Sequence, residues 1–578
     1  MHKIILLLGP AKRQLPLMLV AFLTLSLTEL IGIGLLIPYV NFIVHGNFPD
    51  FGTEIETYFD FESKAQEYLL IAFSFVIILI FLLKFVLSLL MTRIINSFAQ
   101  RQRVIMGLRL LNIFLNQDFL DYVKRSDADG VYEVQTVSAH FYGAIQLILR
   151  SFSDLLILIS LVLLMFIVEP RVLILAIGSI TFVVGGYLIV FRQHLINLGA
   201  RSNKAESGVV GVCQDAFRGF RELRLLGKVD AFVKFLAGEL EEAGRVNVQQ
   251  GYHAIIPRHL VEFCIVVLFV AVFLVAYKSG IDSKQVTSVA VVYVLSSLRI
   301  VPLFTGITAA AARLRSLTDS INRLENLLAG SKKVSTKPVA ASRVLAPKQF
   351  EALQLKNVTF SYPSEEKNVF TDLSLRIKTG ETIGIMGPSG AGKTTLINVI
   401  AGFLHPKEGS VFFNSQSIFE ANISDLGIGY VPQETVSINS SVLKNIILGD
   451  DDTEQNRARA MNAIDAVQLG TVVADLPDGV DTSIGQSGTR ISGGQRQRIA
   501  IARTLYHKKN VIILDEATNA LDEATEARLL TALRIQNKMG AIIVVSHRPS
   551  TLKFCDRVLC LDDGKLKPVV DRENFFAK

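Results

Sequence analysis

Residues 387–394, GPSGAGKT, have the composition and spacing of a phosphate-binding loop. The glycines let successive backbone N–H groups curl around an anion, and the helix that must follow adds the positive end of its dipole. Lys393 would reach the terminal phosphates of a nucleotide, and the Thr394 hydroxyl would bind Mg²⁺. The positions expected to bind the nucleotide are Gly387, Ser389, Gly390, Ala391, Gly392, Lys393, Thr394 and Thr395. Because a short match of this kind also arises by chance, its partners elsewhere in the chain decide its meaning.

Two neighbouring carboxylates follow an apolar run in residues 511–518, VIILDEAT. A buried strand that ends at Asp515 would let this side chain hold Mg²⁺, directly or through water. Glu516 beside it is placed to accept a proton from an attacking water molecule. Together with the phosphate-binding loop, the two acids predict hydrolysis of a nucleoside triphosphate.

A second helix start with paired glycines lies between these motifs, in residues 491–495, ISGGQ. Backbone N–H groups at such a terminus also bind phosphate. The residues expected to bind there are Ser492, Gly493, Gly494 and Gln495. One nucleotide has no obvious need of two phosphate-binding termini in one subunit.

The elements that must position these motifs begin near Leu353, where strand-like and helical patterns start to alternate. This alternation is typical of an α/β domain. We therefore expect an α/β P-loop domain over residues 351–578. A linker over residues 330–350, rich in Ser, Lys and Pro, would join it to the preceding chain.

The chain before this linker, residues 1–329, has a different composition. Half of the residues of the protein are hydrophobic, and they crowd this part in runs long enough to cross a bilayer, which takes roughly 20 residues each. The expected spans lie near 15–44, 68–96, 143–168, 171–193, 255–277 and 284–312. The pattern predicts a polytopic α-helical membrane domain with six spans.

The charges of the loops predict how the spans are oriented. The first loop, 45–67, is acidic with a single Lys, whereas residues 97–125 carry several Arg and Lys side chains. Because positively charged loops stay in the cytoplasm, both termini and the long loops 97–142 and 194–254 are expected there. The helical periodicity of these loops indicates that spans 2 to 5 continue as helices beyond the bilayer.

Composition also bears on partners and metals. The net charge of +7 is accounted for by Lys and Arg at cytoplasmic membrane flanks, so no nucleic acid partner is expected. The cysteines lack metal-ligand spacing and are expected to be buried reduced thiols. They are Cys213, Cys264, Cys555 and Cys560.

The motifs, in this order, resemble the ATP-binding cassette (ABC) family over essentially all of residues 351–570. The resemblance implies ATP and Mg²⁺ as cofactors, with Thr394, Gln433 and Asp515 at the metal. It also implies that Tyr362 stacks on adenine, that Asp522 lies in the D-loop, and that His547 contacts the γ-phosphate.

In this family the signature motif of one subunit completes the phosphate-binding loop of another. That arrangement would explain the second terminus at residues 491–495 and implies a dimer. The sequence departs from the family at Ile491, where Leu is usual, and at Asn519, where Ser is common. It also has TSIGQSG at 482–488, where exporters often have an acidic segment.

Six spans ahead of one cassette resemble the half-transporter exporters of the same superfamily over the whole chain. The resemblance implies a homodimer in the inner (cytoplasmic) membrane that hydrolyses ATP at both sites, with Glu516, His547 and Lys393 as catalytic residues. The chain reversals near 120–134 and 213–228 match the coupling helices of that family. The alternative is an ATP-gated regulator that hardly turns over, and the intact Glu516 argues against it.

Charged residues lie inside the expected spans at similar depths. At 1.5 Å per residue from the external ends, Lys84, Arg258 and Arg299 lie roughly 22–28 Å deep, in the cytoplasmic half of the bilayer. Charges there usually face the interior of the bundle, which favours a cationic substrate cavity. Glu262 follows Arg258 by one helical turn, so a structural ion pair also explains these two residues.

A cationic band that is reached from the cytoplasmic leaflet suits an amphiphile with an anionic head. TELIGIGLLIPYV in the first span and IPRHLVEF at the fifth resemble the bacterial lipid-linked oligosaccharide flippases. The resemblance implies a polyprenyl-pyrophosphate-linked oligosaccharide, moved from the inner to the outer leaflet. A lipid A-type exporter shares the anionic head and is an alternative. A multidrug exporter is another, which a cationic band disfavours.

Overall fold

The structure, a computed structural model, consists of two compact units. The helical unit comprises residues 1–117 and 125–334, and the cassette unit comprises residues 118–124 and 335–578. The expected fold class, a polytopic helical domain followed by an α/β domain, is confirmed. The structure describes residues 2–45, 65–125, 127–168, 170–278, 283–334, 350–363, 365, 367–420, 426–485 and 490–569.

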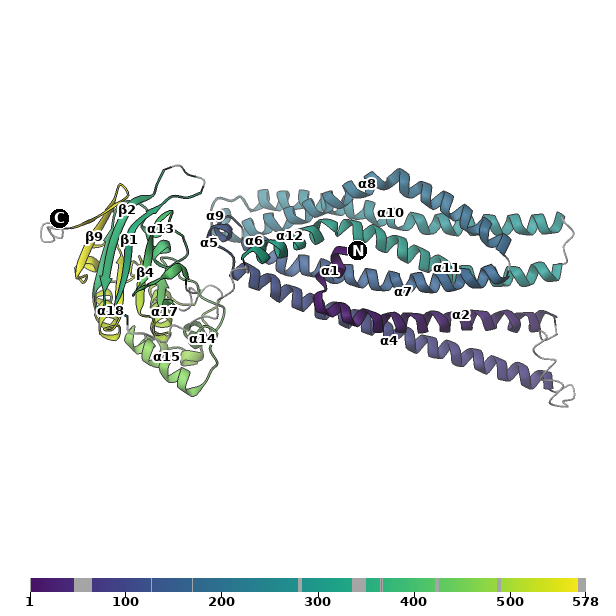
Figure 1. Ribbon diagram of the computed structural model, residues 1–578, viewed down its shortest axis with the longest axis horizontal. Helices are drawn as coiled ribbons and strands as arrows, with labels where there is room; N and C mark the ends of the chain where they lie inside the picture. Colours follow the sequence, from purple (N-terminus) through teal and green to yellow (C-terminus); the bar gives the residue numbers. More distant parts are fainter. Residues whose placement is uncertain are drawn as a thin grey trace. The chain divides into compact units, whose positions relative to one another are not determined.

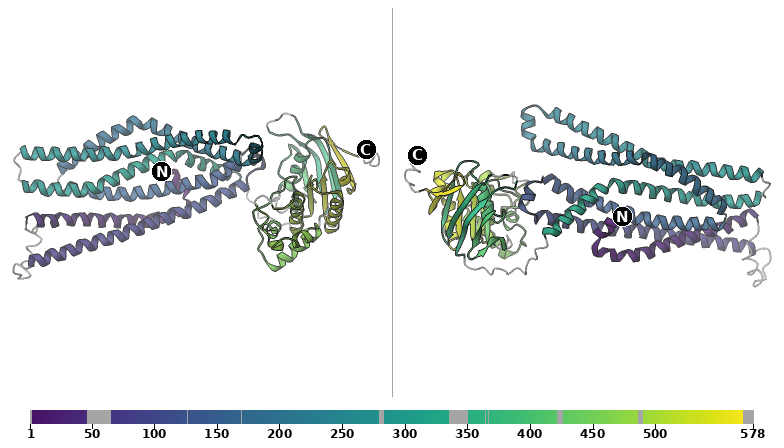
Figure 2. Two further views of the ribbon diagram at one scale, coloured as in Figure 1. Left: turned by 180° about the vertical axis from the view of Figure 1, so that it is seen from behind. Right: turned by 45° about the horizontal axis from the view of Figure 1, so that its top comes forward.

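The helical unit consists of long helices that lie side by side (Figures 1 and 2). They are α2 (Leu15–His45), α4 (Ala65–Leu115), α7 (Ser138–Val168), α8 (Pro170–Arg218), α10 (Val229–Lys278), α11 (Ser283–Ser316) and α12 (Thr318–Val334). Shorter helical segments are α1 (His2–Leu7), η1 (Gly9–Gln14), α6 (Asp127–Tyr132), η2 (Glu133–Val137) and α9 (Phe220–Leu225). Helix α10 packs along α8, α11 packs along α7, and α2 contacts both α4 and α7.

Several of these helices have the length and composition of membrane spans. Four stretches of the described chain qualify, at residues 9–36, 70–115, 129–167 and 229–271. Helix α8 adds a fifth if its two parts, bent by 45° between residues 187 and 189, count as one span. These stretches overlap the first five expected spans. The sixth expected span, 284–312, lies within α11, which is helical but is not among the stretches that qualify.

Three helices are much longer than a bilayer requires. Helix α4 has 51 residues, α8 has 49 and α10 has 50. At 1.5 Å per residue each is about 75 Å long, against about 30 Å for a hydrocarbon core. The prediction that spans continue as helices is confirmed for these three. Helix α12 runs through Val334, so the segment expected as a linker begins as helix, and residues 335–349 lie outside the described residues.

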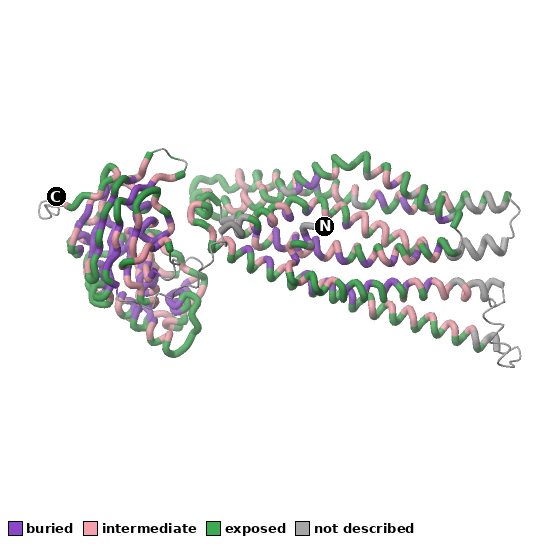
Figure 3. The backbone as a smooth tube through the Cα atoms, viewed as in Figure 1, coloured by how far each residue is buried: buried purple, intermediate pink, exposed green. Residues whose placement is uncertain are grey.

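Many residues of the helical unit are exposed (Figure 3), and many of these exposed residues have large apolar side chains. Phe75 is 73% exposed and Phe182 is 83% exposed, whereas Phe22, Leu110 and Phe141 are buried between helices. Apolar surface of this extent is unfavourable in water and is accommodated in lipid. The burial pattern therefore agrees with a unit that sits in a membrane.

The cassette unit is built on two sheets. The larger has six strands in the order β10-β9-β3-β8-β7-β6, with all neighbours parallel except β10 and β9. The smaller sheet is antiparallel, in the order β2-β1-β4-β5. The strands are β1 (Ala352–Phe360), β2 (Phe370–Lys378), β3 (Thr382–Met386), β4 (Glu408–Phe413), β5 (Gln416–Ser417), β6 (Ile428–Val431), β7 (Val511–Asp515), β8 (Ala541–Val545), β9 (Arg557–Asp562) and β10 (Lys565–Pro568).

The parallel strands bring three loop starts to one edge of the large sheet. Strands β7 and β8 are buried along their whole length, as expected for parallel strands covered by helices. Because β3, β7 and β8 are parallel, their ends at Met386, Asp515 and Val545 share this edge, where open α/β sheets bind ligands. The helices of the unit are α13 (Lys393–Ile400), η3 (Ile418–Glu420), α14 (Val442–Ile447), α15 (Glu454–Ala466), α16 (Gly470–Ala474), η5 (Gly479–Asp481), α17 (Gly493–Tyr506), α18 (Glu523–Gln536) and α19 (Pro549–Leu552).

Short helices occupy the two expected chain reversals. Helix α9 lies within 213–228, and α5 (Phe119–Val123) lies at the start of the other reversal. Residues 118–124 belong to the cassette unit, and the ring of Phe119 lies 5.3 Å from that of Phe403. Asp118 caps α5 by accepting a hydrogen bond from the Leu120 N–H (2.9 Å).

Candidate functional site

The phosphate-binding loop connects β3 to α13, as the sequence predicts. Gly387 and Gly392 have positive φ angles of 153° and 93°. A Cβ atom at Gly387 would lie 2.3 Å from the carbonyl oxygen of Leu561, which leaves no room for a side chain. Glycine is therefore required here by both the backbone conformation and the close packing. Ser389, Gly390 and Ala391 lie in the same loop, and Thr394 lies exposed in the first turn of α13.

Lys393 is buried and folds back over this loop. Its Nζ donates hydrogen bonds to the carbonyl oxygens of Gly387 (2.7 Å) and Pro388 (3.0 Å). These contacts hold the ammonium group against the loop whose backbone N–H groups would bind an anion. The loop and its lysine thus have the geometry of a phosphate site.

Asp515 ends β7 in a buried position and accepts a hydrogen bond from the Tyr430 hydroxyl (3.1 Å). Burial raises the pKa of Asp515 above its usual range, and Lys393 opposes the shift. Burial and the negative charge of Asp515 likewise raise the pKa of Tyr430. A buried carboxylate with one neutral donor fits an oxygen ligand of a divalent cation, and the Thr394 hydroxyl offers a second. The residues present therefore fit Mg²⁺.

Three other side chains contact the Glu516 carboxylate. Its carboxylate accepts hydrogen bonds from Gln433 Nε2 (3.1 Å) and Asn519 Nδ2 (3.0 Å), and it lies 3.3 Å from His547 Nε2. Its backbone has a φ of 50°, and its N–H donates to the Val545 carbonyl at the end of β8. A left-handed conformation is unfavourable for a non-glycine residue and is typical of functional sites. The fold therefore fixes this carboxylate in one position.

Two contributors to this centre were not predicted as site residues. Tyr430 lies in β6, three residues before Gln433, and was assigned no role from the sequence. Asn519 was noted only as a departure from the family pattern, yet it binds Glu516 directly. A hydroxyl or amide next to a predicted catalytic segment is the signal that could have identified both.

The predicted adenine-stacking residue, Tyr362, lies between β1 and β2, just after the end of β1. Its hydroxyl is 3.0 Å from the Thr395 Oγ1 in α13, and its ring meets Phe360 edge-on at 5.1 Å between centroids. These contacts fix the ring beside the helix that follows the phosphate-binding loop.

The signature residues Ser492 and Gln495 form a capping box at the start of α17. The Ser492 side chain accepts from the Gln495 N–H (3.2 Å), and the Ser492 N–H donates to Gln495 Oε1 (2.8 Å). A Cβ atom at Gly494 would lie 3.0 Å from the Ala520 carbonyl oxygen, whereas one at Gly493 would make only ordinary contacts, with the Ala520 Cβ at 3.7 Å and the Arg496 guanidinium at 3.8 Å. In the part of the chain that the structure describes, no hydrogen bond or ion pair joins residues 492–495 to the phosphate-binding loop.

The predicted D-loop residue, Asp522, caps α18 by accepting a hydrogen bond from the Thr525 N–H (2.9 Å). This backbone hydrogen bond holds the pKa of Asp522 below its usual range. The segment before it is tied to the signature helix, because the Ala520 N–H donates to Gln497 Oε1 (3.2 Å). The D-loop and the signature helix therefore form one connected frame.

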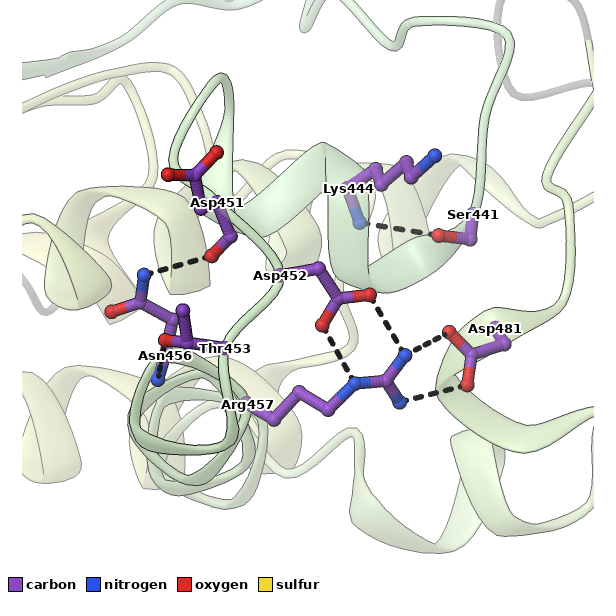
Figure 4. Close-up of polar contacts among 8 residues, drawn as sticks. All are labelled: Ser441, Lys444, Asp451, Asp452, Thr453, Asn456, Arg457 and Asp481. Atoms are coloured by element: carbon purple, nitrogen blue, oxygen red, sulfur yellow. Dashed lines mark hydrogen bonds and ion pairs between the residues drawn. The ribbon is translucent and has the colours of Figure 1, made fainter.

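A charged clamp fixes the chain that leads to the signature (Figure 4). The Arg457 guanidinium donates to both oxygens of Asp452 (2.7 and 2.9 Å) and to both oxygens of Asp481 (2.9 Å each). Beyond Asp481, the Thr482 carbonyl accepts from the Val442 N–H (3.1 Å). The clamp thus joins the start of α15 to the segment that precedes the signature.

The predicted substrate-cavity residues are all found in ion pairs. Lys84 Nζ lies 2.5 Å from Glu29 Oε2, and Arg299 Nε lies 3.1 Å from Glu29 Oε1. Arg258 Nε lies 2.8 Å from Glu262 Oε1, one turn along the same helix. The structure brings Lys84 and Arg299 together, and it gives Arg258 the local partner that was one of its two interpretations.

Comparison with known proteins matches both units to described families. The family described as "ABC transporter" matches residues 370–519, and the one described as "ABC transporter transmembrane region" matches residues 20–303. A protein of Ralstonia nicotianae named "ATP-dependent lipid A-core flippase" is 37% identical over 234 residues, which are 39% of this chain and 40% of that protein. A protein of the same name from Cupriavidus metallidurans is 39% identical over 217 residues, 37% of this chain and 36% of that protein.

The chain spans about two fifths of the length of these curated relatives. A solved structure titled "Structure of a bacterial Atm1-family ABC exporter with ATP bound" is similar over 96% of this chain and 95% of that one, with a TM-score of 0.74 and 20% sequence identity. At this identity the likeness establishes the fold.

Proposed function

The chain belongs to the ABC transporter family, and from that premise we propose that it is one half of a dimeric, ATP-driven exporter in the inner membrane. Its cargo would be an amphiphilic lipid with a phosphate-bearing head, moved from the inner to the outer leaflet. The observation that carries the ATPase part is the Glu516 carboxylate, fixed by Gln433, Asn519 and His547 at the strand edge that holds Asp515.

The residues of the site have separate tasks in this proposal. Bound MgATP supplies the phosphoanhydride bond whose cleavage drives transport. Lys393 leaves the carbonyls of Gly387 and Pro388 and donates to the terminal phosphates. Glu516 accepts the proton of the attacking water, while His547 keeps this carboxylate oriented and neutralises charge that develops on the phosphate.

A dimer follows from the position of the signature. Residues 492–495 form a helix start suited to anion binding, with an exposed Ser492. Among the described residues of one chain, they make no hydrogen bond or ion pair with the phosphate-binding loop. A second copy of the chain would bring this terminus to the loop of its partner, so both sites of a homodimer would be complete.

The cargo is inferred from charge inside the membrane. Lys84, Arg258 and Arg299 lie in helices of the membrane unit, and cations at such depth commonly mark a substrate path. A polyprenyl-pyrophosphate-linked oligosaccharide and a lipid A-type glycolipid share the phosphate that these cations would bind. The names of the relatives give the lipid A-type cargo specific support.

The test is ATP-dependent transfer of lipid across the bilayer of proteoliposomes that contain the full chain. Diphosphoryl lipid A, undecaprenyl-pyrophosphate-linked glycan and a neutral hydrophobic dye would each be offered, with the Glu516→Gln variant as the control. We expect transfer of a phosphate-bearing lipid that the variant loses, together with a fall in ATP hydrolysis of about 10²–10⁴-fold. Transfer of the dye alone, or equal transfer by the variant, would refute the proposal.

A further inference from the structure

Glu29 is a buried carboxylate between two cations that come from two other helices. It lies on α2 and is 3% exposed, with Lys84 of α4 at one oxygen and Arg299 of α11 at the other. No family resemblance or predicted site assigns it a role. Glu29 lies in the TELIGIGLLIPYV stretch that resembles the flippases, but the sequence did not identify it as the counter-ion of the two cations, because they lie on other helices.

The packing of α2 against α4 makes this contact possible. Gly32 lies one turn beyond Glu29, and a Cβ atom there would touch the ring of Phe81 at 3.4 Å. Phe81 in turn lies one turn before Lys84, whose Nζ is 5.1 Å from the centre of its ring. The small residue therefore lets α4 approach closely enough for Lys84 to reach Glu29.

The single carboxylate of Glu29 does not neutralise both cations. The Arg299 side chain is 49% exposed and meets Glu29 only through Nε. Among the described residues, its two terminal amino groups have no hydrogen-bond or ion-pair partner. Two positive charges share one negative charge, so the cluster carries one net positive charge in a segment where unpaired charge is costly. An arriving dianion would satisfy both cations, and a neutral lipid would not.

We propose that Glu29 is the internal counter-ion of the lipid-binding site, which a phosphate-bearing head displaces from Lys84 and Arg299. The inference rests on the proposed function and adds its selectivity. Because a lipid must replace a carboxylate that is already bound, zwitterionic and neutral lipids of the bulk membrane are rejected. Only a head with enough negative charge compensates for breaking the two existing ion pairs.

A purely structural role makes a different prediction. If Glu29 only holds α2, α4 and α11 together, its neutralisation weakens the packing and lowers or preserves lipid affinity. If it competes with the lipid, its neutralisation removes the competitor and raises affinity for phosphate-bearing lipids alone. The two roles are therefore separated by the sign of the change.

Glu133 offers a matched control. It is also 3% exposed and bridges two cations, with Arg323 Nε at 2.7 Å and Arg125 at 3.8 Å. It lies on η2, in the expected reversal 120–134 and ahead of the expected third span, 143–168. The Glu133→Gln variant thus removes a buried carboxylate with the same kind of surroundings but leaves the proposed lipid site intact.

The experiment measures lipid binding to the detergent-solubilised full chain by native mass spectrometry, without ATP. The probes are diphosphoryl lipid A, undecaprenyl pyrophosphate and phosphatidylethanolamine. We expect Glu29→Gln to bind the two phosphate-bearing probes about fivefold tighter or more, with phosphatidylethanolamine binding unchanged. Glu133→Gln should bind all three as the unmodified chain does. In the double variant Glu29→Gln with Arg299→Gln, the gain should disappear.

The proposed displacement of Glu29 would be refuted if folded Glu29→Gln binds both phosphate-bearing probes equally well or more weakly than the unmodified chain. An equal gain in affinity for phosphatidylethanolamine would refute it as well. If Glu29→Gln does not fold, Glu29→Asp keeps the charge on a shorter side chain that reaches only one cation, and an intermediate gain is expected. If the affinity rises for only one of the two phosphate-bearing probes, that probe identifies the class of lipid whose phosphate binds at the site. If binding shifts as expected but ATP drives no transfer in proteoliposomes, the exchange stands and the proposed export fails.

Discussion

Asp515 is a carboxylate that the fold holds where its ionised form is disfavoured. Burial raises its pKa, so without a cation the charged form destabilises the folded chain. A carboxyl group whose pKa is raised in the folded state stabilises the fold fully at pH values below its pKa in the unfolded state, about 3.9. This stabilisation is lost as the pH rises through the pKa of the folded state. At neutral pH the nucleotide-free chain therefore bears the full penalty.

We accordingly expect Asp515→Asn to raise the Tm of the nucleotide-free chain at pH 7, because the amide is uncharged and still accepts from Tyr430. The gain should shrink as pH is lowered toward about 4, where Asp515 is protonated. Calorimetry across this pH range measures it. Asp522→Asn is the matched control of opposite sign, since its pKa is lowered by the hydrogen bond from Thr525. A lower Tm for Asp515→Asn at pH 7 would contradict this account.

Single residues also show what the sequence could and could not predict. Lys393, Asp515 and Glu516 were identified because local spacing determines their geometry. Tyr430 and Glu29 were not, since each acts on a residue distant in sequence, on a neighbouring strand or on other helices. Their roles depend on tertiary packing, which no local pattern encodes.

At the scale of elements, the Arg457 clamp positions the segment in front of the signature. The pairs are on the surface, so their loss should cost about 1 kcal/mol of stability or less. The expected effect of Arg457→Ala is instead on the position of residues 478–484, which Asp481 anchors. We predict a several-fold higher KM for ATP with little change in Tm.

Steady-state ATPase measurements and thermal unfolding check this prediction. Arg457→Lys should be intermediate, because an ammonium group cannot form a bidentate pair with each of two carboxylates, as the guanidinium does. Arg534→Ala is the control, since it removes another surface Arg–Asp pair, with Asp556. A KM for Arg457→Ala equal to that of the control would show that the clamp has no positioning role.

Helix α5 makes a second prediction at this scale. Phe119 packs on Phe403 within the cassette unit, although it lies between two helices of the membrane unit in sequence. If this contact carries the signal of bound lipid, Phe119→Ala should keep basal ATP hydrolysis and lose its stimulation by lipid. ATPase assays with and without diphosphoryl lipid A measure this. Phe220→Ala in α9, where Phe220 is exposed, is the control, and stimulation that persists in Phe119→Ala would contradict the role.

Among the long helices too, some features were predicted from the sequence and others were not. Apolar runs and helical periodicity were enough to predict that α4, α8 and α10 extend past the spans. The end of α12 was not predicted, because Gly330, Ser331 and two lysines read as linker, although the structure continues the helix through Val334. Helix α12 packs against α7 and η2, and this tertiary contact supports a helix that local pattern alone does not predict to its end.

For the whole molecule, the proposed dimer predicts complementation between two different inactive chains. One subunit would carry Lys393→Ala, and the other Gly493→Asp, whose Cβ would meet no atom of its own chain closer than 3.7 Å but which places an acid at the signature terminus. If the signature acts on the partner, each mixed dimer retains one intact site. We expect ATPase activity of about half the unmodified level or somewhat below it in mixed dimers purified by two tags, assuming independent sites, and almost none in either homodimer. Inactive mixed dimers would contradict composite sites.

Helices α4 and α10, each about 75 Å long, can also act as lever arms. A stiff rod of that length, pivoting near one end, moves its other end by about 6 Å for each 5° of tilt. A rotation too small to disturb the hydrogen bonds of the rod thus becomes a displacement wider than a phosphate group at the far end. The length of α4 and α10 beyond the bilayer therefore gives mechanical gain: it exchanges a small angular change at one end for a large linear opening at the other.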